Sequence, residues 1–156
     1  MTVRNQIIIA ISSVLLISCG QKTLYSEFQS LPLNGWEADS ALSYSFDAGM
    51  TDAPCDILLC IRHAENYPYQ NMWLFCSLNN DSTTIWTDTL EFYLADDRGR
   101  WLGNGGLKLY EMPVLFAQNY QLPDSGQCTF TIRHGMRDNC LRGVRDVGVI
   151  INYGKE

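Results

Sequence analysis

The sequence predicts an all-β protein, an antiparallel β-sandwich of about seven to eight strands of the jelly-roll or immunoglobulin-like type, after a cleaved signal peptide. One observation is a central hairpin, because residues 67–106 hold two apolar extended runs separated by the turn residues 79–82. Another is the alternation of apolar and polar residues along several short segments. A third is that no segment shows a convincing helical period.

The N-terminal segment, residues 1–18, has the layout of a bacterial lipoprotein signal peptide. Arg4 precedes an apolar run of about eleven residues, which is too short for a membrane-spanning helix of about twenty. Leu16-Ile17-Ser18-Cys19 fits the lipobox pattern, and polar residues follow it. We therefore expect Cys19 to be acylated and to anchor the mature chain to a membrane. An ordinary secreted protein or an uncleaved anchor is the alternative.

Residues 19–40 are expected to form a lipidated tether, because Pro32 and Asn34-Gly35 interrupt any regular element. Residues 41–156 are expected to form a single β-sandwich domain. Its first strand shows Leu42, Tyr44 and Phe46 in alternation with polar residues. The next strand, at 57–61, is apolar on both faces and should therefore lie in the middle of a sheet.

The later strands follow the same logic. In the second strand of the hairpin, Leu90, Phe92 and Leu94 share one face and polar residues share the other. Segment 107–121 allows either a strand or a short helix at 114–119. The turn chemistry of 122–126 ends it, with Pro123 and Gly126. The last two strands are indicated by alternating apolar residues: Cys128, Phe130, Ile132, Val147, Val149 and Ile151.

Charge and cysteine content limit the partners and the chemistry. The net charge is -6, and loss of Arg4 with the signal peptide makes it about -7, which disfavours nucleic acid as a partner. Five cysteines remain besides Cys19, an odd number in a compartment that permits disulfides. Cys60, Cys76 and Cys128 lie among apolar residues and are expected to be buried thiols, with one or two disulfides as the alternative.

Candidate chemical sites are few. Asp96-Asp97-Arg98-Gly99 with Asn104 offers oxygen ligands for a hard cation such as Ca²⁺, but it lacks the register of a known calcium loop and reads as a solvated turn. His63 and His134 are the two histidines, and nothing in the sequence pairs them with a nucleophile. We expect no enzyme, no cofactor and no metal.

The aromatic residues allow a ligand platform. The four tryptophans and eight tyrosines could stack on sugar rings from one sandwich face. Core filling is the alternative, because a tryptophan in an alternating strand more often points inward. A lipid-anchored carbohydrate-binding module is thus a second functional hypothesis.

Several segments together resemble the gliding motility lipoprotein GldH family. They are the lipobox with Cys19, Leu31-Pro32 followed by Trp36, Tyr67-Pro68-Tyr69-Gln70-Asn71-Met72-Trp73-Leu74-Phe75, Asp88-Thr89-Leu90-Glu91, Leu94-Ala95-Asp96-Asp97 with Gly99, Trp101-Leu102-Gly103 with Gly105, Met136-Arg137, and Gly143-Val144-Arg145-Asp146-Val147-Gly148. The resemblance covers essentially the whole chain. It implies an anchored accessory of the gliding machinery and the associated protein secretion, without enzymatic activity.

On this interpretation the protein binds other envelope proteins of a motility or secretion complex. The candidate contact residues lie in two loops and are Tyr67, Tyr69, Asp96, Asp97 and Trp101. No acidic run follows Cys19, which favours the periplasm-facing leaflet of the cell envelope over the cell surface.

Overall fold

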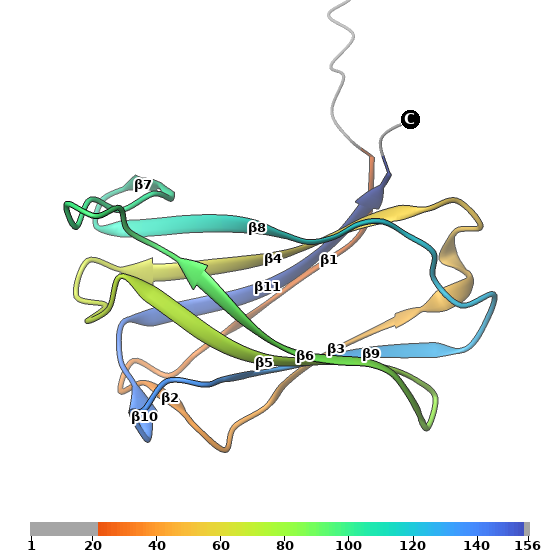
Figure 1. Ribbon diagram of the computed structural model, residues 1–156, viewed down its shortest axis with the longest axis horizontal. Coiled ribbons are helices and arrows are strands. Elements are labelled where there is room, and N and C mark those ends of the chain that lie inside the picture. The colour runs from red at the N-terminus through yellow and green to blue at the C-terminus, as the bar shows by residue number, and fades with distance from the viewer. Residues whose placement is uncertain (1–21, 155–156) are drawn as a thin grey trace, which may run out of the picture.

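The computed structural model describes residues 22–154, so the predicted signal peptide and the predicted lipid attachment site Cys19 lie outside the described residues. The described chain is almost entirely extended (Figure 1), with one short 3-10 turn, η1 (Ala48–Met50). The strands are β1 (Thr23–Ser30), β2 (Trp36–Glu37), β3 (Leu42–Asp47), β4 (Cys55–Ala64), β5 (Asn71–Asn80), β6 (Thr83–Tyr93), β7 (Asn104–Gly106), β8 (Leu109–Tyr120), β9 (Gln127–His134), β10 (Cys140–Leu141) and β11 (Val144–Tyr153).

The long strands form two antiparallel sheets that face each other (Figure 1). One sheet has the order β1-β11-β4-β8-β7 and the other has the order β3-β9-β5-β6, while β2 and β10 pair separately. Apart from the β5–β6 hairpin, each long strand lies in the opposite sheet from the long strand before it. This crossing pattern is the jelly roll. The predicted β-sandwich is confirmed, and its strand order is that of a jelly roll and not that of an immunoglobulin-like fold.

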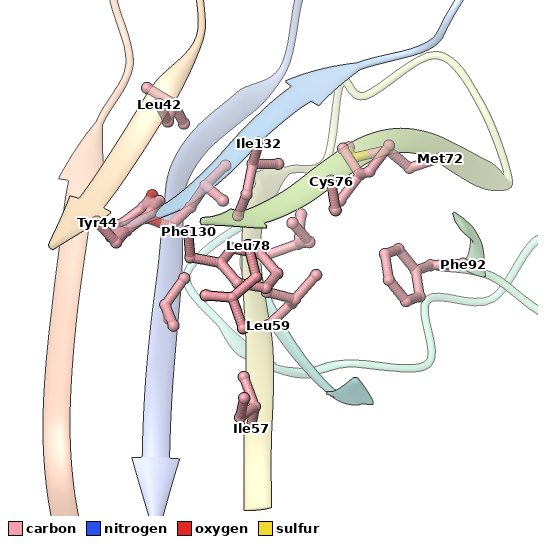
Figure 2. Close-up of a cluster of buried hydrophobic side chains, with 14 of the residues drawn as sticks. Leu42, Tyr44, Ile57, Leu59, Met72, Cys76, Leu78, Phe92, Phe130 and Ile132 are labelled. Atoms are coloured by element: carbon pink, nitrogen blue, oxygen red, sulfur yellow. The ribbon is translucent and has the colours of Figure 1, made fainter. Parts of the chain in front are cut away.

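The core lies between the sheets, and strands such as β3, β5 and β9 supply alternate residues to it. In β3, Leu42, Tyr44 and Phe46 are buried while the residues between them are exposed, as the alternation predicts. Figure 2 shows side chains of β4 meeting those of β3, β5 and β9 in the space between the sheets. Each large apolar side chain buried there contributes about 1.5–3 kcal/mol to folding.

Strand β4 occupies the middle of its sheet, between β11 and β8, as its two apolar faces predict. Its outer face is covered locally by charged side chains. Arg62 forms an ion pair with Glu111 and places its guanidinium 4.0 Å from the ring centroid of Phe28. Cys60 is almost fully buried, and that burial raises the pKa of its thiol to about 11.

The predicted tether is wrong for most of its length. Strand β1 pairs with β11 from Thr23↔Asn152 to Ser30↔Asp146, and β2 pairs with β10. Trp36 is fully buried, and its indole N–H donates to the carbonyl oxygen of Ser40. The sandwich therefore begins at residue 23 and not at residue 41. The alternation in β1 is weak because its residues are only half buried or exposed.

Most of segment 107–121 is strand β8, which runs from Leu109 to Tyr120, so the helical alternative is wrong. Strand β8 pairs with β4 along most of its length. Two irregularities hide its period of two: the register shifts where Phe116 is the extra residue, and Asn119 has a positive φ of 50°.

All five cysteines among the described residues are free thiols, and no disulfide joins them. Cys55, Cys60, Cys76 and Cys128 are buried, which confirms the expectation of buried thiols for the last three. Burial raises the pKa of the Cys76 thiol to about 12, so it stays protonated and unreactive at neutral pH.

Candidate functional site

An aromatic cluster closes one end of the sandwich around His63, at the end of β4. The His63 ring lies 4.5 Å from the Trp101 ring, 5.5 Å from Tyr110 and 5.6 Å from Tyr67, measured between centroids. Tyr67 is only 4% exposed and donates its hydroxyl hydrogen to the carbonyl oxygen of Asn71 at 2.8 Å. Two candidate contact residues, Tyr67 and Trp101, thus come together, but they pack the loops and Tyr67 offers no surface.

His63 is held in its neutral form. The ring is fully buried, which lowers its pKa, and its hydrogen bond to the carbonyl oxygen of Ala64 opposes this only in part. That bond, at 3.1 Å, uses Nδ1, while Nε2 is buried without a partner. The rings of Tyr67, Trp101 and Tyr110 surround the His63 ring, an arrangement typical of packing.

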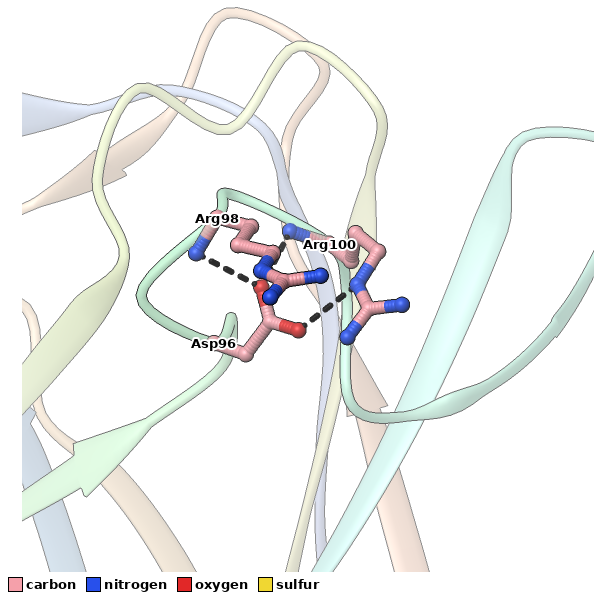
Figure 3. Close-up of polar contacts among 3 residues, drawn as sticks. All are labelled: Asp96, Arg98 and Arg100. Atoms are coloured by element: carbon pink, nitrogen blue, oxygen red, sulfur yellow. Dashed lines mark hydrogen bonds and ion pairs between the residues drawn. The ribbon is translucent and has the colours of Figure 1, made fainter.

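Asp96 organises the loop that follows β6. Figure 3 shows its carboxylate accepting from the backbone N–H of Arg98 and of Arg100, both at 2.9 Å, and from Arg100 Nε at 2.7 Å. The backbone bond from Arg100 is the main cause that lowers the pKa of Asp96. Both carboxylate oxygens are therefore used within the loop, while Asp97 is exposed. No group of three or more potential metal ligands gathers among residues 22–154.

The two candidate loops are joined through Gln70. Its carbonyl oxygen accepts from the N–H of Leu94 at 2.7 Å and of Ala95 at 3.1 Å. Tyr69, from the same loop as Tyr67, lies 6.0 Å from the Tyr67 ring and donates its hydroxyl hydrogen to Asp138 at 3.0 Å. The loops of residues 67–70 and 94–101 are therefore linked by backbone hydrogen bonds, while their role as a contact surface stays a prediction.

Beside Tyr69 the surface is hollowed. We call this depression of about 440 Å³ the outer hollow, and it is lined by Tyr69, Asn71, Trp73, Gly135, Met136 and Arg137. A side chain at position 135 would narrow it, because an added Cβ would come 3.0 Å from the Phe75 ring. The Met136 sulfur accepts from the backbone N–H of Trp73 at 3.2 Å, which fixes this wall of the outer hollow.

The outer hollow continues into an exposed aromatic strip. Trp73, Phe75 and Tyr93 are 38%, 45% and 61% exposed and lie on the outer face of the four-stranded sheet, since Met72, Leu74 and Phe92 face the core. We call these three side chains the aromatic face. It lies next to Arg133, the strand partner of Phe75. Sequence reasoning missed it, because both faces of β5 are apolar and a tryptophan is expected inside.

No helix among the described residues is long and apolar enough to cross a membrane.

Comparison with known proteins gives a consistent result. A family described as GldH lipoprotein matches residues 23–151. The chain is 28% identical over 142 residues to a gliding motility lipoprotein GldH homolog of Christiangramia forsetii, covering 86% of each chain. It is 24% identical over 155 residues to the gliding motility lipoprotein GldH of Flavobacterium johnsoniae, covering 95% of this chain and 96% of that relative.

Two solved structures resemble the chain only remotely. A subviral particle of infectious bursal disease virus VP2 gives a TM-score of 0.32 at 14% identity, with 86% of this chain and 32% of that chain covered. Dimeric latent PorU from Porphyromonas gingivalis gives 0.34 at 10% identity, with 85% and 13% covered. Both TM-scores are below 0.5, so neither likeness bears on fold or function.

Proposed function

This chain belongs to the GldH lipoprotein family, and from that membership we propose that it is an anchored accessory of gliding motility and its associated protein secretion, working by protein–protein contact in the cell envelope. The family match carries the proposal, because it covers nearly the whole jelly roll, from the start of β1 to residue 151 in β11. Acylated Cys19 would hold the domain on the membrane, on the periplasm-facing side.

The aromatic face and the outer hollow support binding to another protein. Tyrosine, tryptophan and arginine dominate the energetics of protein interfaces, and all three line this region as Tyr69, Trp73 and Arg137. The rings stand on a regular strand, so they lose little side-chain freedom on binding. Tyr69, one of the residues proposed from sequence, lines the outer hollow, whereas Tyr67 and Asp96 support the neighbouring loops.

The described residues favour binding over catalysis. His63 and His134 are both buried, and burial lowers the pKa of each. Burial also raises the pKa of the Cys55 thiol to about 11, which keeps it from acting as a nucleophile.

Co-purification of the full-length, lipidated protein from membranes in mild detergent tests the proposal. We expect other envelope proteins of a motility or secretion complex to accompany it, and we expect Trp73→Ala to reduce their recovery at least about tenfold, a typical loss for an interface anchor. Leu115→Ala is the matched control, because Leu115 is 50% exposed on the outer face of the other sheet. Recovery of the wild-type protein alone would contradict the proposal.

A carbohydrate-binding function is the second candidate, and the aromatic face is the observation that favours it. Exposed aromatic rings on one face of a sheet can stack on sugars, and this face carries three of them. Asn71 and Glu91 could supply polar contacts, although the Asn71 amide already donates to Glu91 at 2.6 Å. Binding on a carbohydrate array that is lost in Trp73→Ala, together with no protein recovered on co-purification, would favour this function.

A further inference from the structure

We infer that the outer edge of β6 takes up an extended segment of a partner protein as an added strand, and that this segment carries a basic residue between two aliphatic ones. The inference rests on the proposed function, since it specifies the kind of partner. Strand β6 is an edge strand: its one neighbour in the four-stranded sheet is β5, and no strand among residues 22–154 pairs with its other side.

The hydrogen-bond pattern shows which groups of β6 are free for a partner. In an antiparallel pair, every second residue exchanges backbone hydrogen bonds with the neighbouring strand. The N–H of Leu94 donates to the carbonyl oxygen of Gln70, one residue beyond the pair Asn71↔Tyr93. The even-numbered residues of β6 are therefore the ones that bond to β5. The N–H and C=O groups of Thr87 and Glu91 and the C=O group of Thr89 therefore point away from the sheet and are open to a partner, whereas the outward N–H of Thr89 donates to the Asp88 carboxylate. The register runs without a shift from Trp86 to Tyr93, which gives a straight ladder for an added strand.

The side chains on the inner face of β6 determine what would fit. Trp86, Asp88 and Leu90 share that face, because their partners on β5 include the buried Cys76 and Leu78. The Trp86 and Leu90 side chains line a depression of about 240 Å³, the seam hollow, together with Phe116 and Ala117 of β8. Two aliphatic side chains of an added strand, four positions apart and opposite Trp86 and Leu90, would enter the seam hollow beside these apolar groups.

Asp88 supplies the charge preference. It is exposed, lines the seam hollow, and accepts from the outward-pointing N–H of Thr89 at 2.7 Å. An opposite charge on the added strand, directly across from Asp88, would be stabilising, and a like charge would be destabilising. A carboxylate that points inward from an edge strand also discourages indiscriminate pairing, so Asp88 admits strands with Lys or Arg at that position.

A second copy of the chain fits this edge poorly. Strand β6 contains Asp88 and Glu91 but no basic residue, so self-pairing would bring four carboxylates into one ladder. Strand β8, on the other side of the seam hollow, is a poor edge. Pro113 has no N–H to offer, the register shifts at Phe116, and Asn119 has a positive φ. The partner is therefore expected on β6.

Peptide binding to the full-length protein in detergent micelles tests the inference. The probe is the labelled peptide Thr-Val-Thr-Lys-Thr-Val-Thr with blocked ends, and the control peptide has Glu in place of Lys. We expect the Lys peptide to bind at least about tenfold more tightly by fluorescence anisotropy. Binding should also slow amide hydrogen exchange in β6 and leave β3 unchanged. Equal affinity of the two peptides, or no protection of β6, would overturn the inference.

Variants locate the binding edge. Thr87→Pro removes an outward N–H that the fold does not use, so the protein should fold, shown by an unchanged near-ultraviolet circular dichroism spectrum, and should lose peptide binding about tenfold or more. Thr87→Val keeps the N–H and should bind normally. Asp88→Asn should remove the preference for Lys over Glu whether or not Thr87→Pro folds; a retained preference would contradict the role of Asp88.

The same variants separate this inference from the proposed function. If Thr87→Pro still recovers envelope proteins on co-purification while peptide binding is lost, the proposed function stands and its partner binds elsewhere, which overturns strand addition as the mode of contact. If the Lys peptide binds but the wild-type protein recovers no envelope protein, the edge is functional and the proposed function fails. Light scattering that shows a dimer lost in Thr87→Pro would replace the partner segment with a second copy.

Discussion

The two sides of the sandwich, where edge strands of the opposing sheets meet, differ in how they are closed. On one side β1 and β3 are joined: Gln29 Nε2 donates to the carbonyl oxygen of Ser43 at 2.7 Å, and the rings of Tyr25 and Phe46 lie 5.3 Å apart. We call this the sealed side. On the other side, between β6 and β8, the rings of Trp86 and Phe116 touch at 4.6 Å beside the seam hollow. We call this the open side.

The comparison contrasts a seam that is closed by structural contacts with a seam that, under the proposed strand addition, is left for binding. On the sealed side the fully buried Tyr44 donates its hydroxyl hydrogen to the carbonyl oxygen of Val147 at 2.6 Å, so a polar bond ties the sheets beneath the seam. On the open side the backbone groups of Thr87 and Glu91 on β6 point away from the sheet and pair with no strand among residues 22–154. Substitutions should therefore cost folding stability on the first side and binding on the second.

The largest expected effect is at Tyr44 on the sealed side. Tyr44→Ala should lower the free energy of unfolding by about 3–5 kcal/mol, because it leaves a large cavity in the core. Tyr44→Phe should cost about 1–3 kcal/mol, because the Val147 carbonyl oxygen stays buried without its donor. Urea denaturation measures both. A Tyr44→Ala loss below about 1 kcal/mol would mean that the sealed side contributes no more than the surface does.

The open-side counterpart is Trp86, and its effect on stability should be smaller. Trp86→Ala should lower the free energy of unfolding by about 1–2 kcal/mol, because the ring is half exposed and loses mainly its contact with Phe116. Its main consequence should be weaker binding of the Lys peptide. If Trp86→Ala destabilised the protein as much as Tyr44→Ala, the two sides would be equivalent in stability and the comparison would fail.

Lowering the pH should destabilise the part of the molecule where β4 pairs with β8. Burial lowers the pKa of His63 below its ordinary 6.5, so the unfolded chain binds a proton at a higher pH than the folded protein does. The free energy of unfolding should therefore fall as the pH is lowered through 6.5 toward the folded-state pKa of His63. His63→Phe preserves packing against Trp101 and Tyr110 and should reduce this dependence. Burial also lowers the pKa of His134, so His134 should account for the pH dependence that remains in the His63→Phe variant.

The matched measurement for that prediction is hydrogen exchange at pH 7 and pH 5. After correction for the slower intrinsic exchange at pH 5, the protection factors of β8 amides near Tyr110 should fall between pH 7 and pH 5 by more than those of β1 and β3 amides. A pH dependence that is unchanged in His63→Phe would show that His63 does not contribute to it.

The smallest expected losses of stability come from removing one polar contact on each side, at Gln29 on the sealed side and at Asp88 on the open side. Gln29→Ala should cost about 0.5–1.5 kcal/mol, because it removes the bond that joins β1 to β3. Asp88→Asn should change stability by less than about 0.5 kcal/mol, because Asp88 is exposed and bonds only locally. Thermal unfolding can rank the two. A larger loss of stability in Asp88→Asn than in Gln29→Ala would mean that the contact more important for stability lies on the open side.

Local patterns in the sequence predicted the strands that alternate between the core and water. The β5–β6 hairpin, the alternation in β3 and the central position of β4 are each visible in a few consecutive residues. Strand β1 was missed because its residues are half buried, and β8 was ambiguous because bulged residues interrupt its period. These irregularities depend on the neighbouring strand, which a local pattern does not contain.

The candidate site was only partly predictable for a related reason. Trp101 and Tyr67 were singled out, but their packing on His63 depends on the pairing of distant strands. The sequence did not predict that Trp73 points outward. Strand β5 is apolar on both faces, so the alternation separates the two faces without showing which one faces the core. The open edge of β6 becomes visible only once the strand order is known.

Site-specific photo-crosslinking in living cells tests most directly whether the open side binds partners. A photoreactive residue would replace Thr87 on β6 in one strain and Ser45 on β3 in another; both positions are exposed on edge strands of the same sheet. We predict crosslinks to other envelope proteins from position 87 and none above background from position 45. Equal crosslinking from both positions, or crosslinks from position 45 alone, would contradict the account.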